Sequence, residues 1–340
     1  MTRTVSSPTD HAAHLPTFSV VVPNYNHAHY LEAALQAHLT QKEPPLEIIV
    51  VDDASTDDSC SVIERVAAQH PSVRLVRLPR NGGVNAAINR GLQETRGDYV
   101  CFSAADDLVA KDFAARSLEI LARYPSEGFC FSDPAELQAD SGIVRRFPLY
   151  LSDRPCMLPP RDVERLLAHN YFSFSSNTIL YRREAIVAAG GFVEDLRWYA
   201  DWFANYVLAF RHGVCYVPEV LAYFRVSEGS YSAQGVRQAA VQRDLLYRML
   251  DLLKEDSFRD VAGCFRRAAI VPEVRVRALL WLIASSRHRG YLGSRLCIRL
   301  LFNGIWLALL PYMPVVVRRM ARWLVGMPTR WQVSISKENG

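Results

Sequence analysis

The stretch Tyr99-Val-Cys-Phe-Ser-Ala-Ala-Asp-Asp107 determines how we interpret the rest of the chain. Its first residues are apolar and uncharged, which is typical of a central strand that is covered on both faces. Asp106 and Asp107 follow at the carboxyl end of that strand, where open α/β sheets bind ligands. Adjacent carboxylates repel each other unless a cation or a hydroxyl-rich ligand joins them, and Mg²⁺ takes oxygen ligands together with phosphates. Alternatively, one of these residues caps a helix that begins near Ala110.

Short apolar runs and amphipathic segments alternate along the first 132 residues. The predicted strands are Phe18–Val22, Leu46–Val51, Val73–Leu78, the stretch from Tyr99 and Phe129–Ser132. The predicted helices are Tyr30–Leu39, Ser59–Gln69, a segment from Asn81 to Glu94 and Lys111–Tyr124. This order predicts an α/β fold with a mostly parallel sheet flanked by helices. No G-x-G-x-x-G precedes the first helix, which argues against a nicotinamide enzyme.

The composition is that of a globular protein, but the charge is unevenly distributed. Of the 340 residues, 50% are apolar and 22% are charged, enough for a large core. Residues 1–263 hold 26 Lys and Arg against 33 Asp and Glu, whereas residues 264–340 hold 13 against 2. A basic tail on an acidic body indicates an anionic partner for the tail, either a membrane or a nucleic acid.

The cysteines and the N-terminus favour a cytoplasmic protein. The seven cysteines are scattered and never form C-x-x-C, which favours a reducing compartment, buried thiols and no zinc site. Residues 1–16 are polar, without the apolar core of a signal peptide, and are predicted to be a disordered lead-in.

Several motifs, in this order, resemble those of the family 2 glycosyltransferases. They are Ser19-Val-Val-Val-Pro-Asn-Tyr-Asn26, Glu47-Ile-Ile-Val-Val-Asp-Asp-Ala-Ser-Thr-Asp57, Asn81-Gly-Gly83, Gly97-Asp-Tyr-Val100 and Ala105-Asp-Asp107. The resemblance covers residues 18 to about 232, and a combination of motifs is more specific than any one of them. It implies a GT-A fold over residues 17–235 and transfer of a sugar from a nucleotide-diphospho-sugar, with inversion.

The turns after the first two strands are expected to bind the nucleotide. Tyr25 can stack on a pyrimidine ring, or it can pack on Leu31 at the entry of the helix. Asp53 can accept a hydrogen bond from the ring N–H or from a ribose hydroxyl, as the resemblance implies, or it can cap the following helix. Pro23 and Asn81 belong to the matching motifs and are assigned to donor binding with them.

By resemblance, Asp107 binds Mg²⁺ or Mn²⁺ that bridges the diphosphate, while Asp106 reaches the ribose or the donor sugar. A metal there neutralises the leaving diphosphate. The chain departs from the family pattern in two places, since Ala104 or Ala105 replaces a further Asp and Ile88 stands where Arg often precedes the Asn.

The expected catalytic base lies in Gly190-Gly-Phe-Val-Glu-Asp-Leu-Arg-Trp-Tyr-Ala-Asp-Trp202, which matches the Glu-Asp-Trp region of the family. Asp201 keeps the Asp of that motif, and Ala200 replaces the Glu. Aromatic neighbours can raise the pKa of Asp201, which suits a general base, although Asp201 can also cap the next helix. Arg225 is a phosphate contact or part of a salt bridge, and Ser227 replaces the His that the family often has.

Residues 236–340 are expected to form a helical, basic extension. A helix is predicted from Val236 to Asp256, followed by the apolar stretches Leu279–Ala284, Leu296–Leu310 and Val315–Val325 with Arg residues between them. This pattern favours contact with an anionic membrane, and a lipid-linked acceptor would explain it. The alternative is a helical subdomain that packs on the core or forms a dimer. Nucleic-acid binding is disfavoured because the Arg residues are interleaved with aliphatic runs.

The sequence therefore predicts a glycosyltransferase (a hexosyltransferase) that uses a UDP- or dTDP-linked sugar and a glycan or lipid-linked acceptor. We expect it in bacterial surface-polysaccharide synthesis, at the inner face of the cell membrane. The alternative is a non-catalytic nucleotide-sugar-binding or scaffolding protein, because Ala105, Ala200 and Ser227 replace acids and a His.

Overall fold

The computed structural model describes residues 15–138, 142–169, 172–226, 238–272, 276–309 and 336–337. Most of the predicted lead-in, Ser227 and the stretch Val315–Val325 lie outside the described residues.

Four parallel strands form one half of the sheet. They are β1 (Phe18–Asn24), β2 (Glu47–Asp52), β3 (Val73–Arg77) and β4 (Tyr99–Phe102), in the order β4-β1-β2-β3. Every residue of β2 is buried, which fits a strand covered on both faces. The strands predicted for this half are confirmed to within two residues.

The other half of the sheet is mixed. It comprises β5 (Leu108–Val109), β6 (Phe129–Gln138), β7 (Ile143–Arg146), β8 (Cys156–Leu158), β9 (Leu180–Arg182), β10 (Val214–Val226) and β11 (Ser336–Lys337). β6 and β10 run parallel to each other, whereas β9 joins β4 to β6 by antiparallel pairing. The antiparallel strands were not predicted, because most of them are too short to show a period-two pattern.

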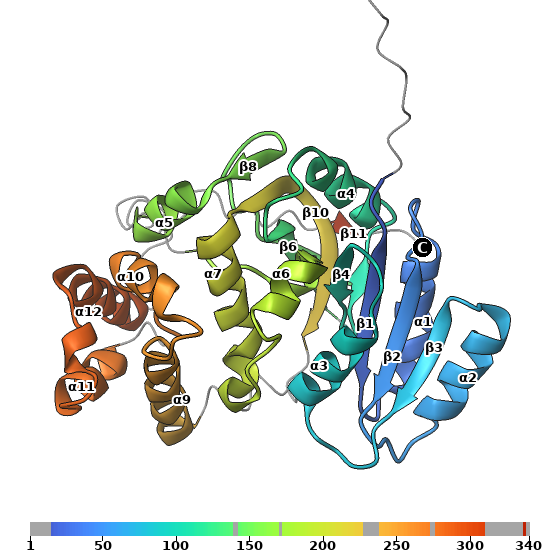
Figure 1. Ribbon diagram of the computed structural model, residues 1–340, viewed down its shortest axis with the longest axis horizontal. Helices are drawn as coiled ribbons and strands as arrows, with labels where there is room; N and C mark the ends of the chain where they lie inside the picture. The colour runs from blue at the N-terminus through green and yellow to red at the C-terminus, as the bar shows by residue number, and fades with distance from the viewer. Residues whose placement is uncertain are drawn as a thin grey trace, which may run out of the picture.

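Helices cover both faces of the sheet (Figure 1). Val20 and Val22 of β1 point to the face that packs against α1 (Ala28–Leu39), α2 (Ser59–Gln69) and α4 (Phe113–Arg123). Val21 points to the opposite face, where α3 (Val84–Glu94), α6 (Arg183–Ala188) and α7 (Ala200–His212) lie. Successive strand residues alternate between faces, so one apolar run supplies both cores.

The C-terminal helices lie beside α7, on the side away from β3 (Figure 1). They are α9 (Ala239–Leu252), α10 (Arg259–Arg267), α11 (Val276–Ala284) and α12 (Ser294–Leu309). Phe265 of α10 is fully buried against Phe203, Tyr206 and Phe210 of α7. Between residues 15 and 309, in the ranges described, no helix combines the length and the apolar character needed to cross a membrane.

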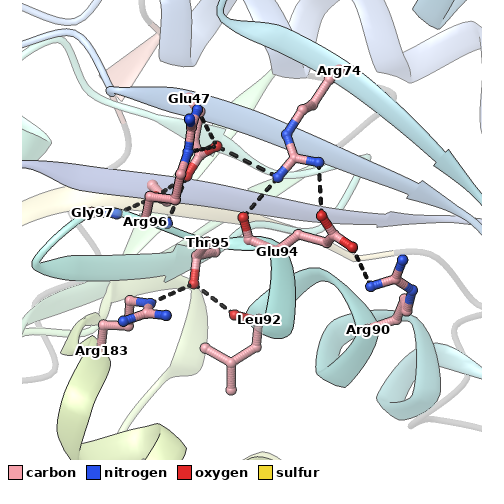
Figure 2. Close-up of polar contacts among 10 residues, drawn as sticks. Glu47, Arg74, Arg90, Leu92, Glu94, Thr95, Arg96, Gly97 and Arg183 are labelled. Carbon is pink, nitrogen blue, oxygen red and sulfur yellow. Dashed lines mark hydrogen bonds and ion pairs between the residues drawn. The ribbon is translucent and has the colours of Figure 1, made fainter.

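A hydrogen-bonded ionic network closes the sheet edge where the parallel strands begin (Figure 2). Buried Glu47 accepts hydrogen bonds from Ser19 Oγ (2.9 Å) and Arg96 N (2.7 Å), and it pairs with the guanidinium of Arg96 (3.2 Å). Burial by itself would raise the pKa of Glu47, but these hydrogen bonds hold it below its ordinary value. Arg74 extends the network from Glu47 to Glu94. This edge is therefore held by internal partners.

Candidate active site

The predicted site residues gather where the parallel strands end. The register pairs Asn24 of β1 with Asp52 of β2, so the loops after these strands leave the sheet side by side. Asp52 accepts hydrogen bonds from Asn24 Nδ2 (2.9 Å) and Ser55 N (3.0 Å), and it therefore orders the turn. Pro23 precedes Asn24 in β1 and pairs with Val51.

The Asp53 carboxylate is buried and binds a distant loop. Its two oxygens accept hydrogen bonds from Gly82 N (2.7 Å) and Gly83 N (2.8 Å), just after the exposed Asn81. It does not cap the next helix, because α2 begins at Ser59, whose N–H is bound by Asp57 (3.0 Å). Asp53 therefore fixes the Asn81-Gly-Gly loop beside the end of β2.

Two non-glycine residues with left-handed backbone frame the same turn. Asn26 has φ 58° and Ala54 has φ 61°, a conformation that costs energy for residues with a Cβ and is found at functional sites. Asn26 Oδ1 accepts a hydrogen bond from Thr56 N (2.7 Å), which ties the loops after β1 and β2 together. Tyr25, next to Asn26, is 45% exposed and therefore presents a ring to solvent at this edge.

The β5–β10 pairing brings Arg225 to the two acids. Leu108 pairs with Tyr223 in antiparallel register, so Arg225 lies beside Asp106 and Asp107. Arg225 N donates to Asp107 Oδ1 (3.1 Å), and its Nε donates to the carbonyl of Asp106 (3.0 Å). Its guanidinium also lies 5.1 Å from the ring centre of Tyr30, a contact that the sequence did not indicate. The alternative that either acid caps a helix is wrong, because α4 begins at Phe113.

The Asp107 carboxylate lies next to a second acid. Burial raises its pKa to about 7, the adjacent Asp106 carboxylate adds to the rise, and Arg225 opposes it. A divalent cation would remove this penalty, since it stabilises the ionised form. Within the described ranges no cluster of three His, Cys, Asp or Glu side chains could hold a metal. Carboxylate oxygens are the type of ligand that Mg²⁺ or Mn²⁺ takes, together with water and substrate phosphates.

Asp201 lies in the first turn of α7, and both of its oxygens are engaged. Oδ2 accepts a hydrogen bond from Ser176 Oγ (2.7 Å), and Oδ1 accepts one from the backbone N–H of Trp202 (2.7 Å). Burial raises the pKa of Asp201, and the bond from Ser176 opposes the rise without cancelling it. The predicted role of Asp201 as a helix cap is wrong, because α7 begins at Ala200 with Tyr199 at its N-cap and without a side-chain capping bond.

A chain of hydrogen bonds connects Asp201 to the sheet. Asn205 Nδ2 donates to Ser176 Oγ (3.0 Å), and Tyr181 donates its hydroxyl hydrogen to Asn205 Oδ1 (2.7 Å). Tyr181 belongs to β9 and pairs with Val100 of β4. The strand that leads to Asp106 and Asp107 is therefore linked to Asp201. Sequence reasoning missed Ser176, since it lies in a serine-rich loop without a recognisable motif.

Two asparagines of α3 position the segment that leads to Asp201. Asn89 binds the backbone of Phe192 twice, donating to its carbonyl (2.8 Å) and accepting from its N–H (2.9 Å). Asn85 Nδ2 donates to the carbonyl of Arg197 (2.8 Å), which has a left-handed backbone at φ 50°. The sequence could have indicated both residues, because Asn85 and Asn89 lie four residues apart, on one face of the predicted helix, next to apolar positions.

Comparison with known proteins places the chain in a family. The family model described as "Glycosyl transferase family 2" matches residues 19–188, half of the chain. The chain belongs to glycosyl transferase family 2. A protein of Mycobacterium tuberculosis without a described function is 30% identical over 73% of this chain and 80% of its own. An uncharacterised Haemophilus influenzae glycosyltransferase is 35% identical over 32% of this chain; the match spans only 43% of that relative.

Solved structures share the GT-A fold of this family 2 member. Staphylococcus aureus TarS, solved with UDP-GlcNAc, aligns over 81% of this chain and 75% of its own, with a TM-score of 0.57 and 20% identity. A Pyrobaculum calidifontis mannosyltransferase, solved with GDP-Man and Mn²⁺, aligns over 93% of this chain and 86% of its own, with a TM-score of 0.54 and 24% identity. At these identities the likeness concerns the fold alone.

Proposed function

We propose that the chain is an active, inverting glycosyltransferase whose donor is a nucleotide-diphospho-sugar. The observation that carries the proposal is the contact of Arg225 with Asp106 and Asp107, at the same sheet edge as Asp53. This edge offers groups for a base, a ribose and a diphosphate in one place. UDP and dTDP are the expected carriers, since the exposed ring of Tyr25 can stack on a pyrimidine and Asp53 follows the neighbouring strand β2.

Asp107 would hold a Mg²⁺ or Mn²⁺ ion, with Asp106 beside it toward the ribose or donor sugar. The ion would supply neutralisation of the charge that develops on the diphosphate as it leaves. Arg225 is held by its hydrogen bonds at the same place, so its guanidinium adds positive charge there.

Asp201 takes the proton of the acceptor hydroxyl in this proposal. The hydroxyl oxygen then attacks the anomeric carbon on the face opposite the diphosphate, which departs, and the configuration inverts. A raised carboxylate pKa supports the role, because it makes Asp201 a stronger base than an exposed aspartate.

The acceptor is proposed to be a glycan or a lipid-linked precursor of a bacterial surface polysaccharide, met at the inner face of the cell membrane. Leu280 and Ile283 of α11 and Ile298 of α12 are large apolar side chains that are more than half exposed. Such residues close to arginines favour an anionic membrane as partner, whereas nucleic acid remains disfavoured.

Thermal-shift measurements with UDP, dTDP, GDP and CMP, each with and without Mn²⁺, test the donor site. We expect a metal-dependent rise of the melting temperature with one pyrimidine diphosphate, and its loss in Asp107→Asn. Asp112→Asn is the matched control, because Asp112 lies just after β5 and pairs with Lys42 on the surface. Equal responses of the two variants would contradict the proposal.

Donor hydrolysis separates the enzyme from the non-catalytic alternative. An active transferase is expected to release nucleoside diphosphate slowly without an acceptor and faster with one. A scaffolding protein of the same fold would bind the nucleotide and release none. Asp201→Asn should keep nucleotide binding and lose turnover.

A further inference from the structure

The C-terminal helices border an open hollow away from the proposed donor site. It lies between α9, α10 and the short turn Arg289–Tyr291, and its volume is about 530 Å³. Its basic lining residues are Lys254, Arg266, Arg267, Arg287 and His288. No acidic side chain is among the described residues that line it. The volume is within the range of sites for small molecules.

The hollow has more basic side chains than carboxylates that pair with them. Asp251 is shared by Lys254 Nζ, Arg287 Nε and His288 Nε2, each at 3.0 Å, and Arg267 pairs with Glu164 at 2.6 and 2.8 Å. The guanidinium of Arg266 lies 5.8 Å from the ring centre of Tyr291. In the described residues, four permanent cations thus meet two carboxylates, which leaves a formal charge of +2 with His288 neutral.

Internal contacts fix part of this charge in place before any ligand arrives. His288 stacks on Tyr247 with ring centres 4.5 Å apart, and its Nδ1 lies 2.9 Å from Ser285 Oγ. The shared Asp251 holds Lys254 and Arg287 near each other despite their repulsion. A bound anion would relieve that repulsion, and guanidinium groups match the oxygens of phosphate in pairs.

We propose that this hollow is a binding site for a phosphate or diphosphate ester, distinct from the donor site. The ester has two possible sources, a lipid headgroup and a soluble phosphorylated molecule. The neighbouring helices favour the lipid. Helix α11 packs on the turn Arg289–Tyr291, which borders the hollow, and the side chains of Leu280 and Ile283 on α11 are exposed.

Gly290 allows a test that removes no existing side chain. It lines the hollow, and a Cβ added there meets no atom within 4 Å. Gly290→Glu therefore places a carboxylate at the hollow, and Gly290→Gln adds the same bulk without charge. Gly293→Glu is the control for net charge, because it adds the same charge as Gly290→Glu. Gly293 does not line the hollow, and a Cβ there also meets no atom within 4 Å. All variants carry Asp107→Asn and are studied with EDTA, so that binding at the donor site does not interfere.

The probes are inorganic pyrophosphate, measured by calorimetry, and phosphatidylcholine vesicles with or without phosphatidylglycerol, measured by co-sedimentation. We expect Gly290→Glu to bind at least one probe about tenfold more weakly or worse than both controls. Loss confined to pyrophosphate assigns a soluble ester, and loss confined to phosphatidylglycerol vesicles assigns a lipid headgroup. The proposal is overturned if the parent protein binds neither probe, or if Gly290→Glu behaves like Gly290→Gln or like Gly293→Glu.

Discussion

Asp201 owes its chemical character to two hydrogen bonds and to its burial. Ser176 binds one carboxylate oxygen and the backbone of Trp202 binds the other, so the group is fixed in orientation. The bond from Ser176 stabilises the ionised form, whereas burial disfavours it. Small changes at Ser176 should therefore alter the basicity of Asp201 without moving its backbone.

The acid limb of the pH–rate profile tests this coupling. Asp201 must be ionised to accept a proton, so kcat/KM should fall as the pH drops through its raised pKa, above the ordinary 3.8. Ser176→Ala removes a bond that lowers this pKa, so we expect the inflection to move to higher pH. Ser175→Ala is the control, because Ser175 binds Asn177 instead. An unchanged acid limb in Ser176→Ala would contradict the proposed role.

His38 makes folding stability depend on pH. Burial in α1 lowers its pKa from 6.5 to about 4, so the unfolded chain binds a proton that the folded protein excludes. The free energy of unfolding should therefore fall as the pH is lowered from 6.5 to 4, by about 3 kcal/mol at the lower end. In urea titrations across this range, His38→Leu should lose that part of the slope. The exposed His29→Gln on the same helix should keep it, and equal slopes would refute the assignment.

At the scale of elements, α3 packs unusually close to β1 and β2. Gly91 faces the sheet, where a Cβ would come within 2.3 Å of Val21 Cγ1 and 3.0 Å of Val51 Cγ2. Since α3 also carries Asn85 and Asn89, this close approach sets the distance between the sheet and the segment before Asp201.

Gly91→Ala should destabilise the fold by about 1–2 kcal/mol, because the overpacking exceeds the gain in helix propensity. Val21→Ala frees space at the same contact, so the double variant should be more stable than the sum of the single effects predicts. Denaturant unfolding of the four proteins measures this coupling. Additive effects would show that α3 moves away from the sheet instead.

Some elements of the structure could be predicted from the sequence and others could not, for physical reasons. The parallel strands β2 and β4 are largely apolar runs that lead to pairs of acids, so their positions and those of Asp53, Asp106 and Asp107 could be predicted. The two-residue β5 has no period to detect, yet its pairing brings Arg225 to the acids. Ser176 reaches Asp201 only through the packing of a loop beside α7, which no local pattern records.

At the scale of the whole molecule, the C-terminal helices and the sheet domain share one core at α7. Phe265 contacts three aromatic rings of α7, the helix that also carries Asp201. The helical extension should therefore unfold together with the sheet, and its loss should disturb the catalytic helix.

Phe265→Ala should lower the free energy of unfolding by about 3–5 kcal/mol, because it leaves a cavity among large rings. Calorimetry should show a single transition at a lower temperature, accompanied by reduced turnover. Ile298→Ala, at a 56% exposed position on α12, should change stability by less than about 0.5 kcal/mol. Two separate transitions, with the higher one unaffected, would show that the extension folds independently.

The direct succession of α7 and β10 has a consequence for inheritance. Asp201 lies in the first turn of α7, Gly213 follows that helix, and Arg225 lies near the end of β10, so Asp201 and Arg225 belong to one continuous stretch of the chain. Tyr25, Asp53 and Asp107 are encoded upstream of it. Because Arg225 contacts Asp106 and Asp107, an exchange of this stretch by recombination would replace the proposed base and one side of the proposed diphosphate site together.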